Sequence, residues 1–185
     1  MHYSRISFVI MLNHIHNILS IVLGTRYIGI AIMNGSDLRD WFVKSLSRKS
    51  VKERITYLIE ITTDFIQRFN IDTLAIKKLH PSRSSPTLNK LNESIKTIAR
   101  NEQISIIEYP ISLIERTLLV GKANKKLLTE EVLRIYPIVY HEYKREEKNK
   151  NRYLTRMFEA IALGIVCNQT LDSKHKISIT HYLNK

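Results

Sequence analysis

Three charged side chains near the C-terminal end of the chain have a spacing suited to binding chemistry. Arg156 and Glu159 stand three residues apart in an apolar stretch, and Arg152 comes one helical turn earlier, so a helix would place all three on nearly the same face. A guanidinium group suits bidentate contacts with phosphate. An ordinary ion pair on a helix surface explains the same spacing, and the sequence does not choose between the two interpretations.

The overall charge favours a polyanionic partner. The chain has 29 Lys and Arg against 17 Asp and Glu, a formal net charge of +12, and phosphates attract such a protein regardless of base sequence. We therefore predict that the partner is nucleic acid. A membrane surface is the competing polyanion, but the basic residues are scattered along the chain and do not line one face of an amphipathic helix. We expect no membrane binding.

Other catalytic and metal-binding patterns are absent from the sequence. His14 and His16 have no third ligand at a recognised spacing. Cys167 is the only cysteine, so a disulfide within the monomer is excluded, and its apolar surroundings indicate a small core residue. The chain has no Gly-x-Ser-x-Gly, no P-loop and no Gly-x-Gly-x-x-Gly. A conventional hydrolase or nucleotide-dependent enzyme has no support.

The length predicts one globular domain with a short extension at each end. Its 185 residues, 44% of them hydrophobic, suffice to bury a core. We predict an N-terminal extension at 1–16, the domain at 17–171 and a polar tail at 172–185; the sequence does not decide whether Met1 or Met11 is the natural start. No signal-peptide cleavage site follows the first apolar run, and no run could span a bilayer, so we expect an intracellular protein, cytoplasmic or nucleoid-associated.

Hydrophobic periodicity and turn residues predict the elements that would position the charged side chains. Three β-favouring runs at 18–23, 27–33 and 41–46 are separated by turn sequences, which predicts an antiparallel meander. Apolar spacing then predicts strands at 73–77 and 104–108 and helices at 55–69, 88–99, 111–119, 125–136 and 154–165. The charged run at 144–152 indicates a solvated loop.

Strands that alternate with helices imply a parallel portion of sheet. The predicted class is therefore α/β: a mixed five-stranded sheet, three antiparallel strands then two parallel, flanked by helices.

Four motifs, in their order along the chain, resemble those of the RuvC-type Holliday-junction resolvases, whose fold is RNase H-like. The resemblance covers about 18–166, and its motifs are Gly24-Thr-Arg-Tyr-Ile-Gly29, Leu74-Ala-Ile-Lys77 with the loop Arg83-Ser84, Glu108-Tyr-Pro110 followed by Gly121-Lys-Ala-Asn-Lys125, and Arg156-Met-Phe-Glu-Ala-Ile-Ala-Leu163.

The resemblance implies a damaged metal site. In this family, carboxylates on the first strand, the fourth strand and the last helix hold two Mg²⁺ ions that hydrolyse a phosphodiester. The matching positions here are Val22, Lys77 and Arg156, and only Glu159 is still acidic. A lysine or arginine beside a divalent cation repels it. We therefore expect no bound metal and no cofactor, and we assign no catalytic residue.

The resemblance also places basic residues around the same face. Lys77 and Arg156 would contact phosphate directly, and His80 lies near the position where resolvases carry an aromatic wedge, although a solvent-exposed histidine is the alternative. A merely solvated basic surface remains an equal explanation for the loop lysines and arginines. The candidate nucleic-acid contacts are Arg26, Lys77, Lys78, His80, Arg83, Lys122, Lys125, Lys126, Arg152 and Arg156. The sequence leaves open whether Tyr27 lies in the core or on this face.

Three hypotheses of function follow. The first is a catalytically inactive, RuvC-like protein that binds branched or duplex DNA through its basic face, as a homodimer if the helix at 87–100 supplies the contact seen in this family. The second is a structural or adaptor subunit of a nucleoprotein assembly. The third is an active, Mg²⁺-dependent junction endonuclease that uses displaced acids such as Asp72, Glu108 or Glu159. The sequence does not separate DNA from RNA.

Overall fold

A mixed five-stranded sheet forms the centre of the protein. The computed structural model describes residues 15–46, 50–121, 124–149 and 153–183, and the strands lie in the order β3-β2-β1-β4-β5. β1, β2 and β3 are antiparallel, whereas β4 pairs parallel to β1 and β5 parallel to β4. This is the predicted sheet. The strands are β1 (Asn17–Leu23), β2 (Tyr27–Asn34), β3 (Asp37–Ser45), β4 (Thr73–Lys77) and β5 (Ser105–Tyr109).

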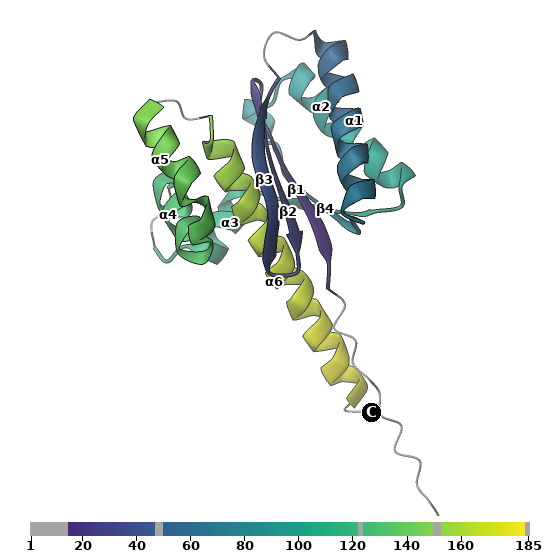
Figure 1. Ribbon diagram of the computed structural model, residues 1–185. Coiled ribbons are helices and arrows are strands. Elements are labelled where there is room, and N and C mark those ends of the chain that lie inside the picture. The colour runs from purple at the N-terminus through teal and green to yellow at the C-terminus, as the bar shows by residue number, and fades with distance from the viewer. Residues whose placement is uncertain (1–14, 47–49, 122–123, 150–152, 184–185) are drawn as a thin grey trace, which may run out of the picture.

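Helices cover both faces of this sheet (Figure 1). Two helices, α1 (Val51–Arg68) and α2 (Pro86–Asn101), pack on one face. The long helix α6 (Thr155–Leu183) crosses the other face and extends beyond the sheet, next to α3 (Ile111–Leu118), α4 (Lys125–Ile135) and α5 (Tyr140–Asn149). Two short 3₁₀ turns, η1 (Pro81–Arg83) and η2 (Pro137–Val139), join these elements. Within the described ranges, no helix is both long and apolar enough to cross a membrane.

Side-chain alternation along the strands divides the core into two layers. In β1, Ile18 and Val22 pack with α6, while Leu19 and Ile21 pack with α1 and α2, because successive residues of a strand point to opposite faces. In β4 the same alternation puts Ala75, and therefore Lys77, on the α6 side. The strand pattern thus sends the last residue of β4 toward the start of α6.

The helix α6 lies unusually close to β1 and β2 because glycines line the contact. A Cβ added at Gly29 in β2 would lie 1.9 Å from the carbonyl oxygen of Arg156, and one added at Gly164 would lie 2.4 Å from Met33 Sδ. The Ser20 hydroxyl of β1 donates a hydrogen bond of 2.8 Å to the carbonyl oxygen of Ala160. These contacts fix the first turns of α6 against the sheet.

Capping residues start the helices at the expected places. Ser50 forms a capping box with Glu53 at the start of α1, which satisfies two backbone groups that the helix leaves open. Asn124 accepts a hydrogen bond of 2.9 Å from the backbone N–H of Leu127 at the start of α4. Because a capping asparagine fixes the first turn, the backbone of Lys125 is held in a defined position.

Two segments differ from the sequence prediction. The prediction of a loop at 144–152 is wrong as far as Asn149, because α5 continues to that residue. Lys, Arg and Glu are good helix formers. A helix without an apolar stripe gives no periodic signal in the sequence. The helix predicted at 154–165 is longer in the structure, since α6 continues through residues 172–183 of the predicted polar tail and ends at Leu183. Residues 150–152 and 1–14, with the question of Met1 or Met11, lie outside the described residues.

The apolar face of α2 packs inside its own domain. Leu88, Leu91 and Ile95 are at most 7% exposed and contact the core between α1 and the sheet. The exposed residues of α2 are polar, apart from Pro86 at its start. This helix therefore has no spare apolar face for the homodimer contact predicted at 87–100, and the homodimer stays a prediction.

Candidate functional site

Four charged side chains from three elements meet at the C-terminal end of β4, and we call them the Glu159 cluster: Lys77, Lys125, Arg156 and Glu159. Glu159 Oε2 lies 2.5 Å from Lys77 Nζ and 2.9 Å from Arg156 Nη1. Glu159 Oε1 lies 3.4 Å from Lys125 Nζ. Lys77 and Glu159 are separated by 82 positions in the sequence, so this contact depends on α6 packing across the sheet.

The members of the Glu159 cluster differ strongly in exposure. The Glu159 side chain is 2% exposed and that of Lys77 14%, whereas those of Arg156 and Lys125 are 31% and 62% exposed. The single carboxylate therefore forms the floor of the cluster, and the cations lie progressively nearer to solvent. A ligand that approaches from solvent meets Lys125 and Arg156 first.

The charges in the cluster keep Glu159 ionised. Burial alone would raise the pKa of Glu159, but Lys77, Arg156 and Lys125 together outweigh burial, so the pKa of Glu159 lies below its ordinary value of 4.5. The pKa of Lys77 is lowered by burial and further by Arg156 and Lys125, against the opposing attraction of Glu159. Three cationic side chains surround one carboxylate, so the cluster carries a net positive charge at neutral pH.

The turn between β1 and β2 forms one wall of this site. A Cβ added at Gly24 would lie 3.1 Å from Arg156 Nε and 2.9 Å from the carbonyl oxygen of Tyr27. Arg26, in the same turn, is exposed. Val22, two residues before Gly24, is fully buried in the core beneath α6. An aliphatic side chain at this position supplies packing and no polar ligand.

Sequence comparisons find no relative, but solved structures share the fold. No protein-family model and no curated protein matches the chain. Thermus thermophilus RuvC in complex with a Holliday junction substrate matches at 16% identity over 81% of this chain and 90% of that chain, with a TM-score of 0.63. Thermus thermophilus RuvC alone matches at 14% identity over 80% and 90%, with a TM-score of 0.64. The yeast mitochondrial Holliday junction resolvase matches at 12% identity over 91% and 85%, with a TM-score of 0.60.

This chain has a RuvC-type fold. The predicted RNase H-like architecture is therefore confirmed, over most of the chain and over at least 85% of each of these structures. At identities of 12–16%, the likeness concerns the arrangement of the backbone. The chemistry of the site depends on the side chains that this chain places there.

Those side chains do not fit the pair of Mg²⁺ ions that the RuvC family implies. Magnesium requires several oxygen ligands in near-octahedral geometry, and the Glu159 cluster contains one carboxylate, whose two oxygens already face Lys77, Arg156 and Lys125. In the ranges 15–46, 50–121, 124–149 and 153–183, no group of three or more His, Cys, Asp or Glu could hold a metal ion. The Glu159 cluster therefore lacks the oxygen ligands that a metal-dependent hydrolysis would need.

The displaced acids of the endonuclease hypothesis do not join the cluster. Asp72 lies just before β4, at the end opposite Lys77, where it accepts a hydrogen bond of 2.9 Å from the backbone N–H of Asn17. Glu108 points to the α2 side of the sheet and lies 2.8 Å from Lys96. Because these acids lie at the far end and on the far face of the sheet, neither supplements Glu159.

Of the other predicted contact residues that the structure describes, none contacts Glu159. Lys78 and Arg26 are exposed. Lys126 is exposed on α4 and lies 3.7 Å from Glu130. His80 is exposed, and its Nδ1 accepts a hydrogen bond of 3.3 Å from the backbone N–H of Ser82 at the start of η1, a capping role that the sequence does not signal. Of the remaining candidates, the backbone of Arg83 ends η1, and Lys122 and Arg152 lie outside the described residues.

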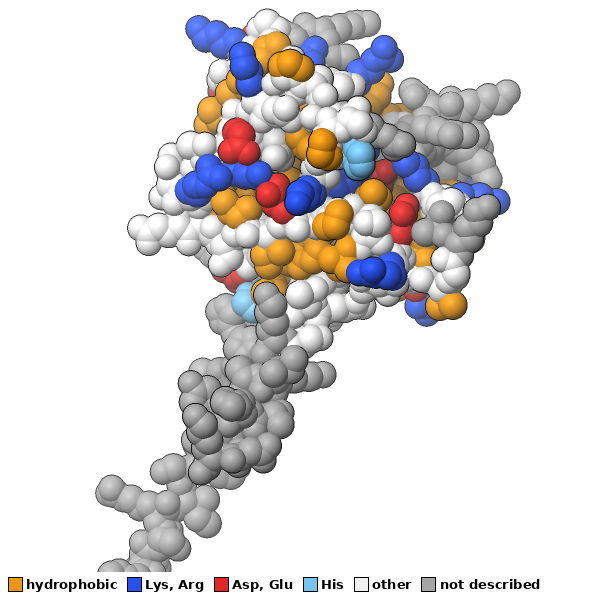
Figure 2. Space-filling model, turned by 180° about the vertical axis from the view of Figure 1, so that it is seen from behind, with side chains coloured by type: hydrophobic (Ala, Val, Ile, Leu, Met, Phe, Trp, Pro, Cys, Tyr) orange, Lys and Arg blue, Asp and Glu red, His pale blue; other side chains and the backbone are white. Residues whose placement is uncertain are grey.

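The charge on the surface opposite to the view in Figure 1 is mixed. Figure 2 shows that Lys and Arg side chains occur there in separate groups, with acidic and apolar side chains between them. This view contains no single continuous basic patch. The net charge of +12 therefore does not by itself define a binding surface. The feature that indicates a binding surface is the Glu159 cluster.

Proposed function

We propose that this chain is a RuvC-like nucleic-acid-binding protein that does not cut its substrate by two-metal chemistry. In this proposal it binds branched or duplex DNA on the side of the fold that carries the Glu159 cluster. The observation that carries the proposal is the set of three cations around one buried carboxylate; of these four residues, Lys77, Arg156 and Glu159 stand where the resemblance puts metal ligands of the family. A RuvC of the same fold has been solved with a Holliday junction substrate.

The geometry supports different roles for the cations. Lys77 is 14% exposed and bonded to Glu159, so its role is to neutralise the carboxylate, which would otherwise repel a phosphate. Lys125 and Arg156 reach solvent and are the phosphate contacts: arginine can make a bidentate contact and lysine a point-charge contact. Arg26 and Lys78, both exposed, extend this surface.

The proposal predicts salt-sensitive binding that needs no divalent cation. Fluorescence anisotropy of labelled four-way junction, duplex and single-stranded oligonucleotides in EDTA measures the affinity. We expect the affinity to fall steeply, by two orders of magnitude or more, between about 50 and 200 mM salt if at least four phosphates are contacted. The Lys125→Ala variant should weaken binding to every DNA and reduce the salt slope by about one unit.

Lys90→Ala provides the matched control. Lys90 is an exposed lysine on α2, on the other face of the sheet, and its removal changes the net charge by the same amount. The proposal requires Lys125→Ala to weaken binding much more than Lys90→Ala. Equal effects would mean that binding depends on total charge, and absence of binding to any of the oligonucleotides at low salt would overturn the proposal.

A cleavage assay and a co-purification experiment separate the competing functions. Cleavage of a four-way junction in Mg²⁺ or Mn²⁺, lost in Glu159→Ala, would establish the endonuclease and end the proposal of a non-cutting protein. A defined partner that co-purifies with a chain lacking affinity for free nucleic acid would establish the adaptor subunit. Comparison of RNA with DNA and of junction with duplex gives the substrate preference.

A further inference from the structure

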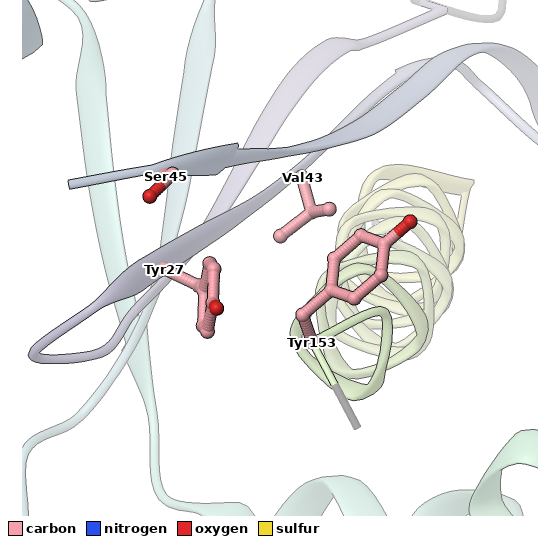
Figure 3. Close-up of a pocket in the computed structure, with 4 residues that line it drawn as sticks. All are labelled: Tyr27, Val43, Ser45 and Tyr153. Atoms are coloured by element: carbon pink, nitrogen blue, oxygen red, sulfur yellow. The ribbon is translucent and has the colours of Figure 1, made fainter. Parts of the chain in front are cut away.

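A pocket lined by two tyrosines (Figure 3) adjoins the turn between β1 and β2, whose Gly24 lies close to Arg156 of the Glu159 cluster. Its lining residues are Tyr27 at the start of β2, Val43 and Ser45 near the end of β3, and Tyr153 two residues before α6. The volume is about 320 Å³, at the lower end of the range for small-molecule pockets. Figure 3 shows the two rings turned toward each other, with Val43 above them and Ser45 further along the strand.

The pocket and the cationic site share the turn between β1 and β2. The carbonyl oxygen of Tyr27 and Nε of Arg156 both lie within 3.1 Å of the position that a Gly24 Cβ would occupy. Arg26 directly precedes Tyr27 and is exposed, and Tyr153 comes three residues before Arg156. The backbone of Tyr27 and the guanidinium of Arg156 thus lie at the same turn, so a phosphate in contact with Arg156 would lie near the pocket.

The ring geometry defines how a base would bind. The ring centroids of Tyr27 and Tyr153 are 5.9 Å apart and the planes are inclined by 44°, the ordinary contact of a tilted aromatic pair. No space for a base remains between the rings. A base would stack on the open face of one ring and touch the other with its edge, with the methyl groups of Val43 as an apolar wall and the exposed Ser45 at the rim.

We propose that this pocket binds an unpaired nucleobase, stacked on Tyr27 or Tyr153 while a neighbouring phosphate contacts Arg156. The inference rests on the proposed function and deepens it, because it names the feature of the nucleic acid that the protein selects. Stacking on an aromatic ring accepts every base, so the pocket distinguishes an unpaired base from a paired one and reads no sequence. The protein then prefers bulged or branched DNA to a continuous duplex.

A fluorescent base reports occupation of the pocket directly. The probe is a DNA duplex with one bulged 2-aminopurine, titrated with the full-length protein in EDTA, beside the fully paired duplex. Stacking on tyrosine changes the 2-aminopurine fluorescence. In the Tyr27→Leu/Tyr153→Leu variant, we expect this change to be lost and the affinity for the bulged duplex to fall about tenfold, with little effect on the paired duplex. Tyr27→Phe/Tyr153→Phe keeps both rings and should bind as the unchanged protein does.

Tyr140→Leu is the matched control, because Tyr140 is an exposed tyrosine at the start of α5. Circular dichroism and urea unfolding establish that each variant is folded before it is titrated. If the unchanged protein binds neither duplex, the proposed function fails. If it binds both duplexes with equal affinity, without a change in 2-aminopurine fluorescence and without an effect of the leucine variant, only the pocket is overturned.

Discussion

The Gly29→Ala variant is expected to lose about 3 kcal/mol of the free energy of unfolding, at the upper end of the range for overpacked cores. The added Cβ would lie 1.9 Å from the carbonyl oxygen of Arg156, 2.2 Å from its carbonyl carbon and 2.6 Å from the backbone nitrogen of Met157. All three atoms belong to the backbone of α6, so no side-chain rotation relieves the overlap. The first turns of α6 must move away from β2.

This displacement should also disturb the Glu159 cluster. Arg156 and Glu159 lie on the part of α6 that Gly29 contacts, while Lys77 is fixed in β4. The hydrogen bond of 2.5 Å between Lys77 on β4 and Glu159 on α6 does not survive a shift of an ångström or more. We therefore expect Gly29→Ala to weaken nucleic-acid binding in addition to destabilising the fold.

Gly164→Ala is the matched control for this prediction. Its Cβ would meet Met33 Sδ at 2.4 Å and Ser20 Oγ at 3.0 Å, and both are side-chain atoms. A methionine can change rotamer, and alanine is favoured over glycine within a helix by up to about 1 kcal/mol. Urea unfolding should show a much smaller loss than for Gly29→Ala. Equal stability of Gly29→Ala and the unchanged protein would contradict the close packing of α6.

Local sequence signals account for most of the fold. The apolar runs and turn residues gave all five strands, because alternation and turn chemistry act over a few residues. β3 nevertheless begins at Asp37, four residues before the predicted run at 41–46. Its first residues pair with β2 across the turn, and all of them except Leu38 carry polar side chains. The helix α5 escaped prediction because its helical conformation does not depend on an apolar stripe.

The candidate site was only partly predictable. The resemblance associated Lys77, Arg156 and Glu159 with one location, and the structure adds direct contact among them and with Lys125. The sequence could not show that Lys77 is hydrogen-bonded to Glu159 and largely removed from solvent, because this contact and this burial depend on how closely α6 packs against the sheet. Tyr153 was missed for the same reason: its proximity to Tyr27 is a tertiary contact.

The Glu159→Gln variant is expected to lose about 3 kcal/mol of the free energy of unfolding, because removal of one partner leaves a buried charge uncompensated. Lys77 would remain 14% exposed, close to Arg156 and Lys125, with no carboxylate to balance the three cations. Glu130→Gln makes the same chemical change in an exposed pair, in which Glu130 lies 3.7 Å from Lys126, and should cost less than about 1 kcal/mol.

A double variant separates the lost charge from the lost side chain. Lys77→Met/Glu159→Leu removes both buried charges and keeps similar volumes, and replacement of a buried pair by apolar residues is often neutral. It should therefore be more stable than Glu159→Gln in urea unfolding. If the double variant is the less stable of the two, the ion pair contributes more than the burial of its charges costs.

The pKa of Glu159 also predicts a dependence of stability on pH. The folded-state pKa lies below the ordinary value of 4.5, so between these two values the unfolded chain binds more protons, and stability rises with pH. The contribution of Glu159 is complete above pH 4.5 and is lost as the pH falls through the folded pKa. In Glu159→Gln this contribution is absent, so the difference in stability between the two proteins should shrink as the solution is acidified.

Nucleic-acid binding should respond to Glu159→Gln in the opposite direction from stability. The substitution removes one negative charge from beneath Lys125 and Arg156, so a phosphate at the cluster is repelled less. Under conditions in which the variant remains folded, we expect equal or tighter binding of a four-way junction in anisotropy measurements. A metal-dependent nuclease would behave differently, because loss of its remaining acidic ligand would abolish cleavage. Weaker binding by folded Glu159→Gln would mean that the carboxylate positions the cations, and the proposed phosphate contacts would then depend on the intact cluster.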